Sequence, residues 1–379
     1  MYVRQQDPTM RKFLPIFLLL LTWMTMLVSS CHATERHLLY VATPGIRNYL
    51  EYGGHGLLVF DIDRGHQFVK RIPTGGINDE GQPINVKGIC ASADSRLIHI
   101  STITSLVCLD MVTEKLLWER EYDKGCDRMA LSPDGKVIYL PSFENDVWYV
   151  LDAMTGDELA RLTLNSRAHN TVYGLDGRRC YLAGLASPVL SVADTSTHTV
   201  AHGVGPFSHS IRPFTVNGRE TLAFVCVNEC LGFEIGDINT GEKLFRVEVG
   251  GFEQGPVKRH GCPSHGIGLT PDERELWVCD AHNQQMHVFD ATVMPPQQVA
   301  SIALRDEPGW INFSHDGRFA YPSSGDVIDV ETREIVAQLT DEEGRAVGSE
   351  KLLEIDWDGE TPVRAGNQFA LGEVGEVGE

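Results

Sequence analysis

The stretch Arg259–Asp290, RHGCPSHGIGLTPDERELWVCDAHNQQMHVFD, contains one complete copy of a repeat that the rest of the chain approximates. Read with a period of two, it predicts three short strands, at His265–Leu269, Glu275–Cys279 and Met286–Asp290, with polar turn residues between them. A meander of three strands cannot bury both of its faces alone. We therefore expect further copies of the repeat to pack against it.

Turn residues followed by a strand recur along the chain. They are Asp94, Asp134, Asp176, Asn217, Asp272 and Asp316, and the successive distances between them are 40, 42, 41, 55 and 44 residues. A period of about 40–45 residues built from short strands is typical of a β-propeller, in which each blade is a four-stranded antiparallel sheet. The repeat thus predicts an all-β fold.

The count of copies predicts seven blades. Six copies begin with an inner strand, whereas the first copy begins one strand late, at His37–Ala42. We expect a C-terminal strand, Lys351–Ile355, to complete the first blade, because closing the ring leaves no open sheet edge. The predicted propeller spans residues 31–357, and residues 358–379 are expected to form an acidic C-terminal tail.

The best-preserved copy, Leu131–Leu162, begins with the turn Ser-Pro-Asp-Gly and continues to Val150-Leu151-Asp152-Ala153-Met154-Thr155-Gly156. This pattern resembles the YVTN and lactonase-like seven-bladed propeller superfamily, and the resemblance covers residues 36–357. It implies the same fold. It does not imply one function, because the architecture serves sugar lyases, lactonases, dehydrogenase subunits and binding proteins.

The N-terminus has the arrangement of an export signal. Arg11-Lys12 precede an apolar run, Phe13–Val28, and small residues follow it. Residues 1–30 are therefore expected to be a signal peptide, and the protein periplasmic or extracellular. The sequence Leu27–Cys31 resembles a bacterial lipobox, in which Cys31 would be lipidated; the alternative is soluble secretion after Ala33.

The composition limits the classes of partner. The chain has 379 residues, of which 42% are hydrophobic, and a formal net charge of −20. Such an acidic surface repels nucleic acid and anionic lipid, so we expect no nucleic-acid partner, and membrane contact only through a lipid anchor. We expect a monomer. The nine cysteines include no C-x-x-C pair, and only Cys226 and Cys230 are spaced to bridge a hairpin.

Aligning the repeats on their turns predicts which residues meet at the mouth of the central channel. Seven positions before each turn lie Lys87, Asp127, His169, Ser210, His265 and Gly309. The longest interval adds a loop, Gly250–Pro263, on the same face, and this loop carries a basic triplet that suits capture of an anion. The predicted ligand-binding residues are Lys87, Asp127, Arg128, Asn170, Arg212, Lys258, Arg259 and His260.

Three functions remain open. The first is a non-catalytic propeller that binds an anionic or carbohydrate ligand, a small molecule or a glycan, at the channel face. The second is metal-assisted β-elimination on uronate-containing glycans, and the third is a lactonase. For elimination, Arg259 or Arg128 would neutralise the substrate carboxylate, His265 or His169 would act as base, and Tyr52 or His260 as acid.

A divalent metal would be the cofactor of the second function. Imidazoles from different blades can converge on a channel, and His169, His209 and His265 are the expected ligands. Histidines at strand starts also commonly hydrogen-bond to neighbouring backbone, so the metal site and this structural role both stay open.

Overall fold

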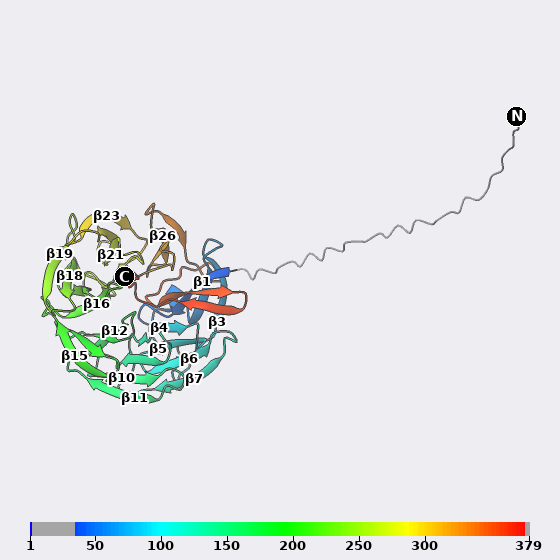
Figure 1. The fold of residues 1–379 in the computed structure, drawn as a ribbon, viewed down its shortest axis with the longest axis horizontal. Helices are drawn as coiled ribbons and strands as arrows, with labels where there is room; N and C mark the ends of the chain where they lie inside the picture. Colours follow the sequence, from blue (N-terminus) through cyan, green and yellow to red (C-terminus); the bar gives the residue numbers. More distant parts are fainter. Residues whose placement is uncertain (2–34, 376–379) are drawn as a thin grey trace. The chain divides into compact units, whose positions relative to one another are not determined.

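The computed structural model describes Met1 and residues 35–375. Residues 2–30 of the predicted signal peptide, Cys31 and the last four residues lie outside the described residues. Seven sheets of antiparallel strands stand radially around one axis, with β4, β12 and β16 near the axis and β7, β11 and β15 at the rim (Figure 1). The predicted seven-bladed β-propeller is confirmed.

Each blade from the second to the sixth is one copy of the repeat, running from the inner to the outer strand. The second blade consists of β4 (Val86–Ser92), β5 (Leu97–Thr102), β6 (Ser105–Asp110) and β7 (Leu116–Glu121), and the third of β8 (Ala130–Leu131), β9 (Val137–Pro141), β10 (Val147–Asp152) and β11 (Glu158–Thr163). The fourth consists of β12 (Ala168–Tyr173), β13 (Arg179–Gly184), β14 (Leu190–Asp194) and β15 (Thr199–Val204), and the fifth of β16 (Ile211–Val216), β17 (Leu222–Val227), β18 (Gly232–Asp237) and β19 (Lys243–Glu248). The sixth consists of β20 (Ile267–Leu269), β21 (Glu275–Asp280), β22 (Gln285–Asp290) and β23 (Gln297–Ala303).

The seventh and first blades complete the ring. The seventh is β24 (Ile311–Phe313), β25 (Phe319–Pro322), β26 (Asp326–Asp329) and β27 (Ile335–Gln338). The first is β28 (Leu352–Asp358), β1 (Glu35–Thr43), β2 (Gly56–Asp61) and β3 (Gln67–Ile72), with a fifth strand, β29 (Thr361–Ala365), beside β28. The short 3-10 helix η1 (Leu50–Tyr52) lies in the loop between β1 and β2.

Burial explains why these segments form strands in this order. The second strand of a blade is covered on both faces, and all six residues of β5 are buried. The outermost strand meets solvent, and β7 is mostly exposed. Apolar clusters between neighbouring blades form the core, in which Trp148 and Trp277 are among the largest fully buried side chains. The core is therefore a ring of interfaces between blades rather than a single central cluster.

The ring closes as expected from the C-terminal apolar run. β28 pairs antiparallel with β1, with Leu38 opposite Ile355 and Val41 opposite Leu352. The closing strand thus completes the first blade and joins two ends of the chain that are more than 300 residues apart. Both edges of β1 are paired, with β28 on one side and β2 on the other.

The segment after the closing strand differs from the expected acidic tail. β29 adds a strand, and residues 368–371 are buried. Gln368 accepts a hydrogen bond from the Ile89 backbone and donates one to the Met129 carbonyl oxygen, and the Ala370 carbonyl accepts one from Leu269. Residues 366–372, which we call the channel segment, therefore contact the inner strands of several blades. Their few apolar residues were too short a run to predict as structure from the sequence.

Eight cysteines lie in the described part of the chain, all of them buried and free, so Cys226 and Cys230 form no disulfide there. Within residues 35–375, no helix is long and apolar enough to cross a membrane.

Candidate functional site

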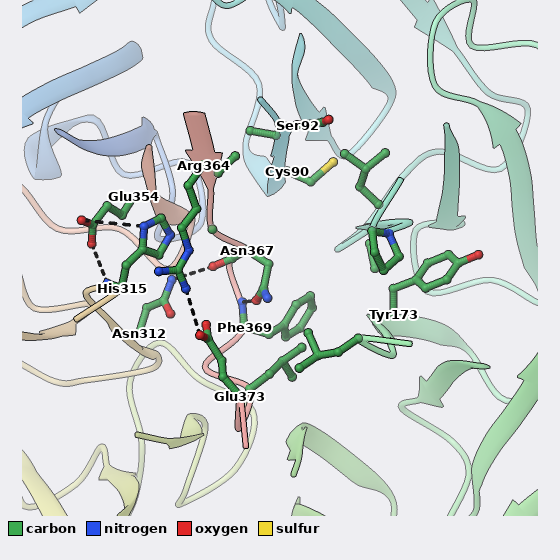
Figure 2. Close-up of a pocket in the computed structure, with 18 of the residues that line it drawn as sticks. Cys90, Ser92, Tyr173, Asn312, His315, Glu354, Arg364, Asn367, Phe369 and Glu373 are labelled. Atoms are coloured by element: carbon green, nitrogen blue, oxygen red, sulfur yellow. Dashed lines mark hydrogen bonds and ion pairs between the residues drawn. The ribbon is translucent and has the colours of Figure 1, made fainter. Parts of the chain in front are cut away.

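The channel has two differently built ends. A cavity of about 350 Å³ lies where the inner strands end, and its lining includes Ser92, Asn312, His315 and Glu354 (Figure 2). The predicted site residues lie at the other end, where the inner strands begin. We call ten of the residues there the mouth cluster: Lys87, Asp127, Arg128, His169, Asn170, His260, His265, Trp310, Glu350 and Lys351. The mouth cluster brings together most of the residues predicted from the sequence and is the candidate functional site.

Asp127 is the first carboxylate of the mouth cluster. It is fully buried, and its oxygens lie 2.7 Å from Nδ1 of His169 and 3.2 Å from Nζ of Lys87. Burial by itself would raise the pKa of Asp127, but His169, Lys87 and Arg128 hold it below its ordinary value. Asp127 is therefore an ionised acceptor that orients two neighbouring side chains.

His169 is held neutral beside this carboxylate. Burial lowers the pKa of His169, although Asp127 opposes the change. Because the ionised carboxylate can only accept, Nδ1 carries the proton and donates it to Asp127. The other ring nitrogen, Nε2, has no hydrogen-bond partner among the described residues and keeps its lone pair. An oriented neutral imidazole of this kind can accept a proton from a ligand.

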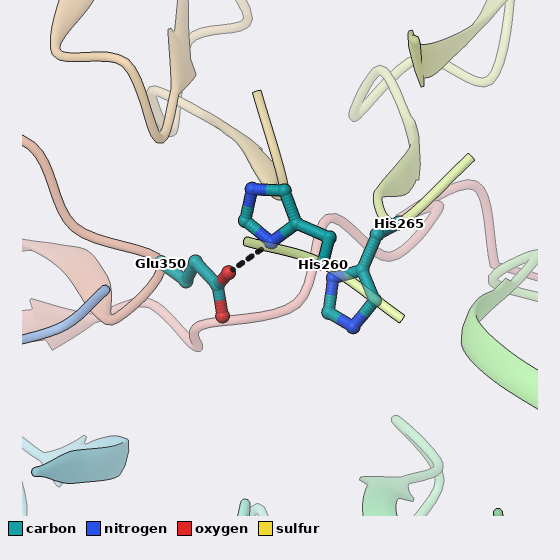
Figure 3. A group of neighbouring side chains, drawn as sticks. All are labelled: His260, His265 and Glu350. Carbon is teal, nitrogen blue, oxygen red and sulfur yellow. Dashed lines mark ion pairs between the residues drawn. The ribbon is translucent and has the colours of Figure 1, made fainter. Parts of the chain in front are cut away.

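His260 and His265 lie together on the far side of the cluster. Their rings stack with centroids 5.1 Å apart and planes 23° apart, and Nδ1 of His260 is 3.0 Å from Glu350 (Figure 3). Nδ1 of His265 is 3.1 Å from the Gly309 carbonyl oxygen. Burial lowers the pKa of His265 well below its ordinary value. His265 is thus a neutral, backbone-bonded imidazole.

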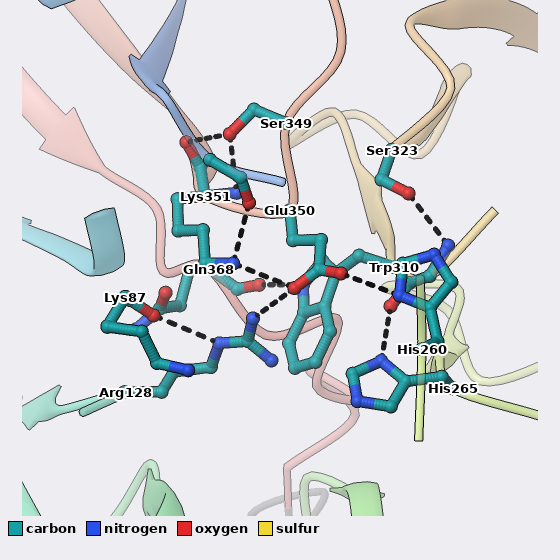
Figure 4. A network of polar contacts seen from close by, with 12 residues as sticks. Lys87, Arg128, His260, His265, Trp310, Ser323, Ser349, Glu350, Lys351 and Gln368 are labelled. Carbon is teal, nitrogen blue, oxygen red and sulfur yellow. Dashed lines mark hydrogen bonds and ion pairs between the residues drawn. The ribbon is translucent and has the colours of Figure 1, made fainter. Parts of the chain in front are cut away.

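Glu350 is the second carboxylate, and it joins residues far apart in sequence (Figure 4). One oxygen lies 2.7 Å from both the Arg128 guanidinium and Nζ of Lys351, and the other faces His260. Burial would raise the pKa of Glu350, yet Lys351, His260 and Arg128 hold it well below its ordinary value. Burial lowers the pKa of Lys351 to about 7 against the opposing effect of Glu350.

Arg128 connects the mouth cluster to the channel segment. Its guanidinium carbon lies 3.7 Å from the centre of the Trp310 ring, a cation–π contact. The indole N–H of Trp310 donates to the Gln368 carbonyl oxygen at 2.7 Å. The channel segment thus contacts the mouth cluster through Trp310.

The structure distributes the predicted metal ligands differently from the expectation. His260, His265 and Glu350 place one ligand atom each within 4.8 Å of one another, and neither His169 nor His209 belongs to this group. Nδ1 of His169 is bonded to Asp127, and His209 faces Glu229 at 3.7 Å. Arg128 and Lys351 already neutralise Glu350, and stacked rings do not direct their in-plane lone pairs to one point. This group is therefore held by ion pairs and a backbone hydrogen bond, although Nε2 of His260 is buried without a hydrogen-bond partner.

Three of the other residues predicted to bind or to react, Arg259, Tyr52 and Arg212, have partners within the protein. Arg259 pairs with Asp306 at 2.7 Å and donates to the Tyr52 hydroxyl, so neither Arg259 nor Tyr52 projects freely. Arg212 donates to Asn228 at 2.6 Å. Lys258 is exposed.

Two mouth residues were missed from the sequence, Glu350 and Lys351. A signal was present, since they directly precede the closing strand and so occupy the start of the first blade's inner strand. The alignment of the repeats counted seven residues back from each turn residue. It did not reach Glu350 and Lys351, because no turn residue of the repeat follows them at that distance.

Comparisons with known proteins show the fold alone. No protein-family model matches this chain, and no curated protein matches its sequence. Among solved structures, one similar chain is described as dihydro-heme d1 dehydrogenase NirN in complex with DHE, with a TM-score of 0.60 and 15% identity. The match covers 87% of this chain and 73% of that one. As 1620 solved chains match, the likeness does not select a function.

Proposed function

We propose that this propeller binds a small carboxylate-bearing ligand, of the sugar-acid class, at the mouth cluster. The observation that carries the proposal is the arrangement of Lys87 and His169 around buried Asp127. Next to them, Nδ2 of Asn170 is a buried donor without a partner. A ligand carboxylate would give this donor and the Lys87 ammonium an acceptor.

Charge supports an anionic ligand. Two cationic side chains of the cluster, Lys87 and Arg128, and the amino group of Lys351 face two carboxylates, Asp127 and Glu350. The whole chain carries a formal net charge of −20. Within an acidic surface, a site whose carboxylates are balanced by cationic side chains is the place where an anion is least repelled.

Calorimetric titration with D-glucuronate, and with D-glucose as the neutral control, tests this function. We expect binding of the uronate and at least tenfold weaker binding of glucose, because only the uronate pairs with Lys87. The K87A variant should lose at least tenfold in affinity, whereas K115A, at an exposed turn lysine, should bind as the wild type does. Equal affinity for both sugars, or full affinity in K87A, would contradict the proposal.

The state of His169 favours a second candidate function, β-elimination on uronate-containing glycans. In this reaction a base takes the proton next to the carboxylate, and the C–H electron pair forms a double bond. The C–O bond to the leaving sugar breaks, and its oxygen takes up a proton from solvent water. The neutral Nε2 of His169 suits the first step, and Lys87 suits the stabilisation of the carboxylate.

A panel of uronate polymers, followed by the ultraviolet absorbance of the unsaturated product, tests the lyase. We expect the wild type to produce absorbance and H169Q to lose at least a hundredfold in rate. Uronate affinity should stay within about twofold in H169Q, since Lys87 is retained. No absorbance with any polymer would reject the lyase while leaving ligand binding intact. No observation favours a lactonase.

A further inference from the structure

A second group of potential ligands lies at the opposite end of the channel from the mouth cluster. We call it the His315 triad: His315, Glu354 and Asp356. Nδ1 of His315 lies 2.8 Å from Asp356 and 3.9 Å from Glu354, and its backbone N–H donates to Glu354 at 2.8 Å. One ligand atom from each residue lies within 4.8 Å of the other two.

The fold brings these residues together from two blades. Glu354 and Asp356 are two positions apart in β28, so both side chains lie on the same face of the closing strand. His315 belongs to the turn between β24 and β25 of the seventh blade. The triad therefore spans the contact at which the ring closes.

The triad is buried and incompletely satisfied. Glu354 and Asp356 are 4% and 6% exposed. Oδ1 of Asp356 and Nε2 of His315 are buried without a hydrogen-bond partner. A buried acceptor without a donor is costly, so the unpaired carboxylate oxygen indicates a missing partner.

Electrostatics distinguishes this triad from the group around Glu350. Within residues 35–375, no lysine or arginine pairs with Glu354 or Asp356, and their ion pairs are both with His315. Glu350, by contrast, is paired with Arg128 and Lys351. Two adjacent carboxyl groups without a compensating lysine or arginine do not both ionise readily, and a divalent ion would supply the positive charge that stabilises both as carboxylates.

We propose that the His315 triad binds one divalent transition-metal ion of the Zn²⁺ type. The donor set, one imidazole nitrogen and two carboxylate oxygens, suits such an ion. Ligands about 2.0–2.2 Å from a tetrahedral ion are about 3.3–3.6 Å apart, between the observed 2.8 and 3.9 Å. His315 and Glu354 also line two cavities, of about 350 and 490 Å³, which give water access to the remaining coordination position.

The bound ion would fasten the seventh blade to the closing strand. It would replace the proton on Nδ1 of His315, so binding releases that proton. It would also act mainly on the folded chain, because His315 is 39 residues from Glu354 in sequence and meets the two carboxylates only when the ring is closed. Its expected role is to stabilise ring closure.

Titration of the full chain, purified without an affinity tag and treated with chelator, tests the proposal with Zn²⁺ as the probe. We expect one equivalent to bind and the melting temperature to rise with Zn²⁺ concentration. H315Q and D356N should lose at least tenfold in affinity, whereas H260Q, in the group around Glu350, should bind as the wild type does. No stoichiometric binding, or full affinity in D356N, would overturn the proposal.

A measurement on the wild type alone guards against variants that do not fold. Co²⁺ in a tetrahedral site of nitrogen and oxygen ligands gives d–d absorption much stronger than that of aqueous Co²⁺, without a thiolate charge-transfer band. We expect this spectrum at one equivalent of Co²⁺, and its loss on addition of Zn²⁺. A thiolate band would assign the ion to the cysteines, and a spectrum no stronger than that of aqueous Co²⁺ would show no ion in such a site; either result overturns the proposal.

Discussion

Lys351 is a lysine buried within the mouth cluster, and its ionisation affects stability. Its Nζ contacts Glu350 and the Gly45 carbonyl oxygen, both at 2.7 Å, and Arg128 and Lys87 are the nearby cations. Burial is the main cause that lowers the pKa of Lys351 from 10.5 to about 7. The folded protein therefore keeps an ammonium here only at a free-energy cost when the pH is below about 7.

We predict that Lys351 makes stability rise with pH. Between pH about 7 and 10.5 the unfolded chain binds more protons at this residue than the folded protein does, so the free energy of unfolding increases with pH in that window. Glu350 stays ionised throughout it, since its pKa is well below the ordinary value. Urea denaturation at pH 7, 8 and 9 should show wild type gaining stability relative to K351M. A constant or falling difference would contradict this.

The channel segment is an element that contacts several blades at once. The Gln368 side chain hydrogen-bonds to the backbone of Ile89 in the second blade, at 3.2 Å, and of Met129 at the third, at 2.8 Å. The backbone carbonyl oxygen of Gln368 accepts a hydrogen bond from Trp310 at the seventh blade. Thr215 of the fifth blade donates to Ala370 at 2.5 Å. The segment thus holds the inner strands at fixed positions around the channel.

We predict that Q368A destabilises the fold by about 2–4 kcal/mol, because it leaves a buried N–H and a buried carbonyl oxygen without partners. Denaturant unfolding measures the change. The matched control is a chain that ends after Gly375, which keeps the whole channel segment and should change stability by less than about 0.5 kcal/mol. If Q368A were as stable as this control, the side chain would not be holding the blades.

For the molecule as a whole, the N-terminal stretch bears on the localisation of the protein. We propose export with a lipid on Cys31, on the basis of the basic, apolar and small residues that end in Leu-Val-Ser-Ser-Cys. Membership of the YVTN and lactonase-like superfamily likewise stays a prediction. Both bear on the proposed ligand, since an exported propeller would meet uronate glycans outside the cell.

We predict that a bacterial host labels the wild type with radioactive palmitate and that C31A loses the label, because acylation needs the Cys31 thiol. C226A, at a buried cysteine, should keep it. Gel autoradiography of the two variants gives the answer. A wild type that is unlabelled and free in the extracellular or periplasmic fraction would instead support soluble secretion after Ala33.

The repeat alone predicts most of the fold. Strand alternation and turn residues are local properties, so the spacing of Asp94, Asp134 and their counterparts indicates the blades. The apolar run Lys351–Ile355 likewise predicts the closing strand, observed as β28. The channel segment was not predictable in this way, because its burial depends on hydrogen bonds to strands more than 200 residues earlier.

The repeat in the amino-acid sequence is enough to predict a seven-bladed ring and the strand starts that face one end of its channel. How the polar side chains there are paired depends on the folded chain: Glu350 pairs with Arg128, 222 residues away, and His265 stacks on His260 rather than on His169 or His209. The tertiary structure also decided that Asp356 and Glu354 have no compensating lysine or arginine in the described chain. Strand periodicity is a local property and fixes which face of a sheet a residue occupies. Charge pairing instead depends on loop paths and side-chain directions that bring two groups within about 3–4 Å of each other.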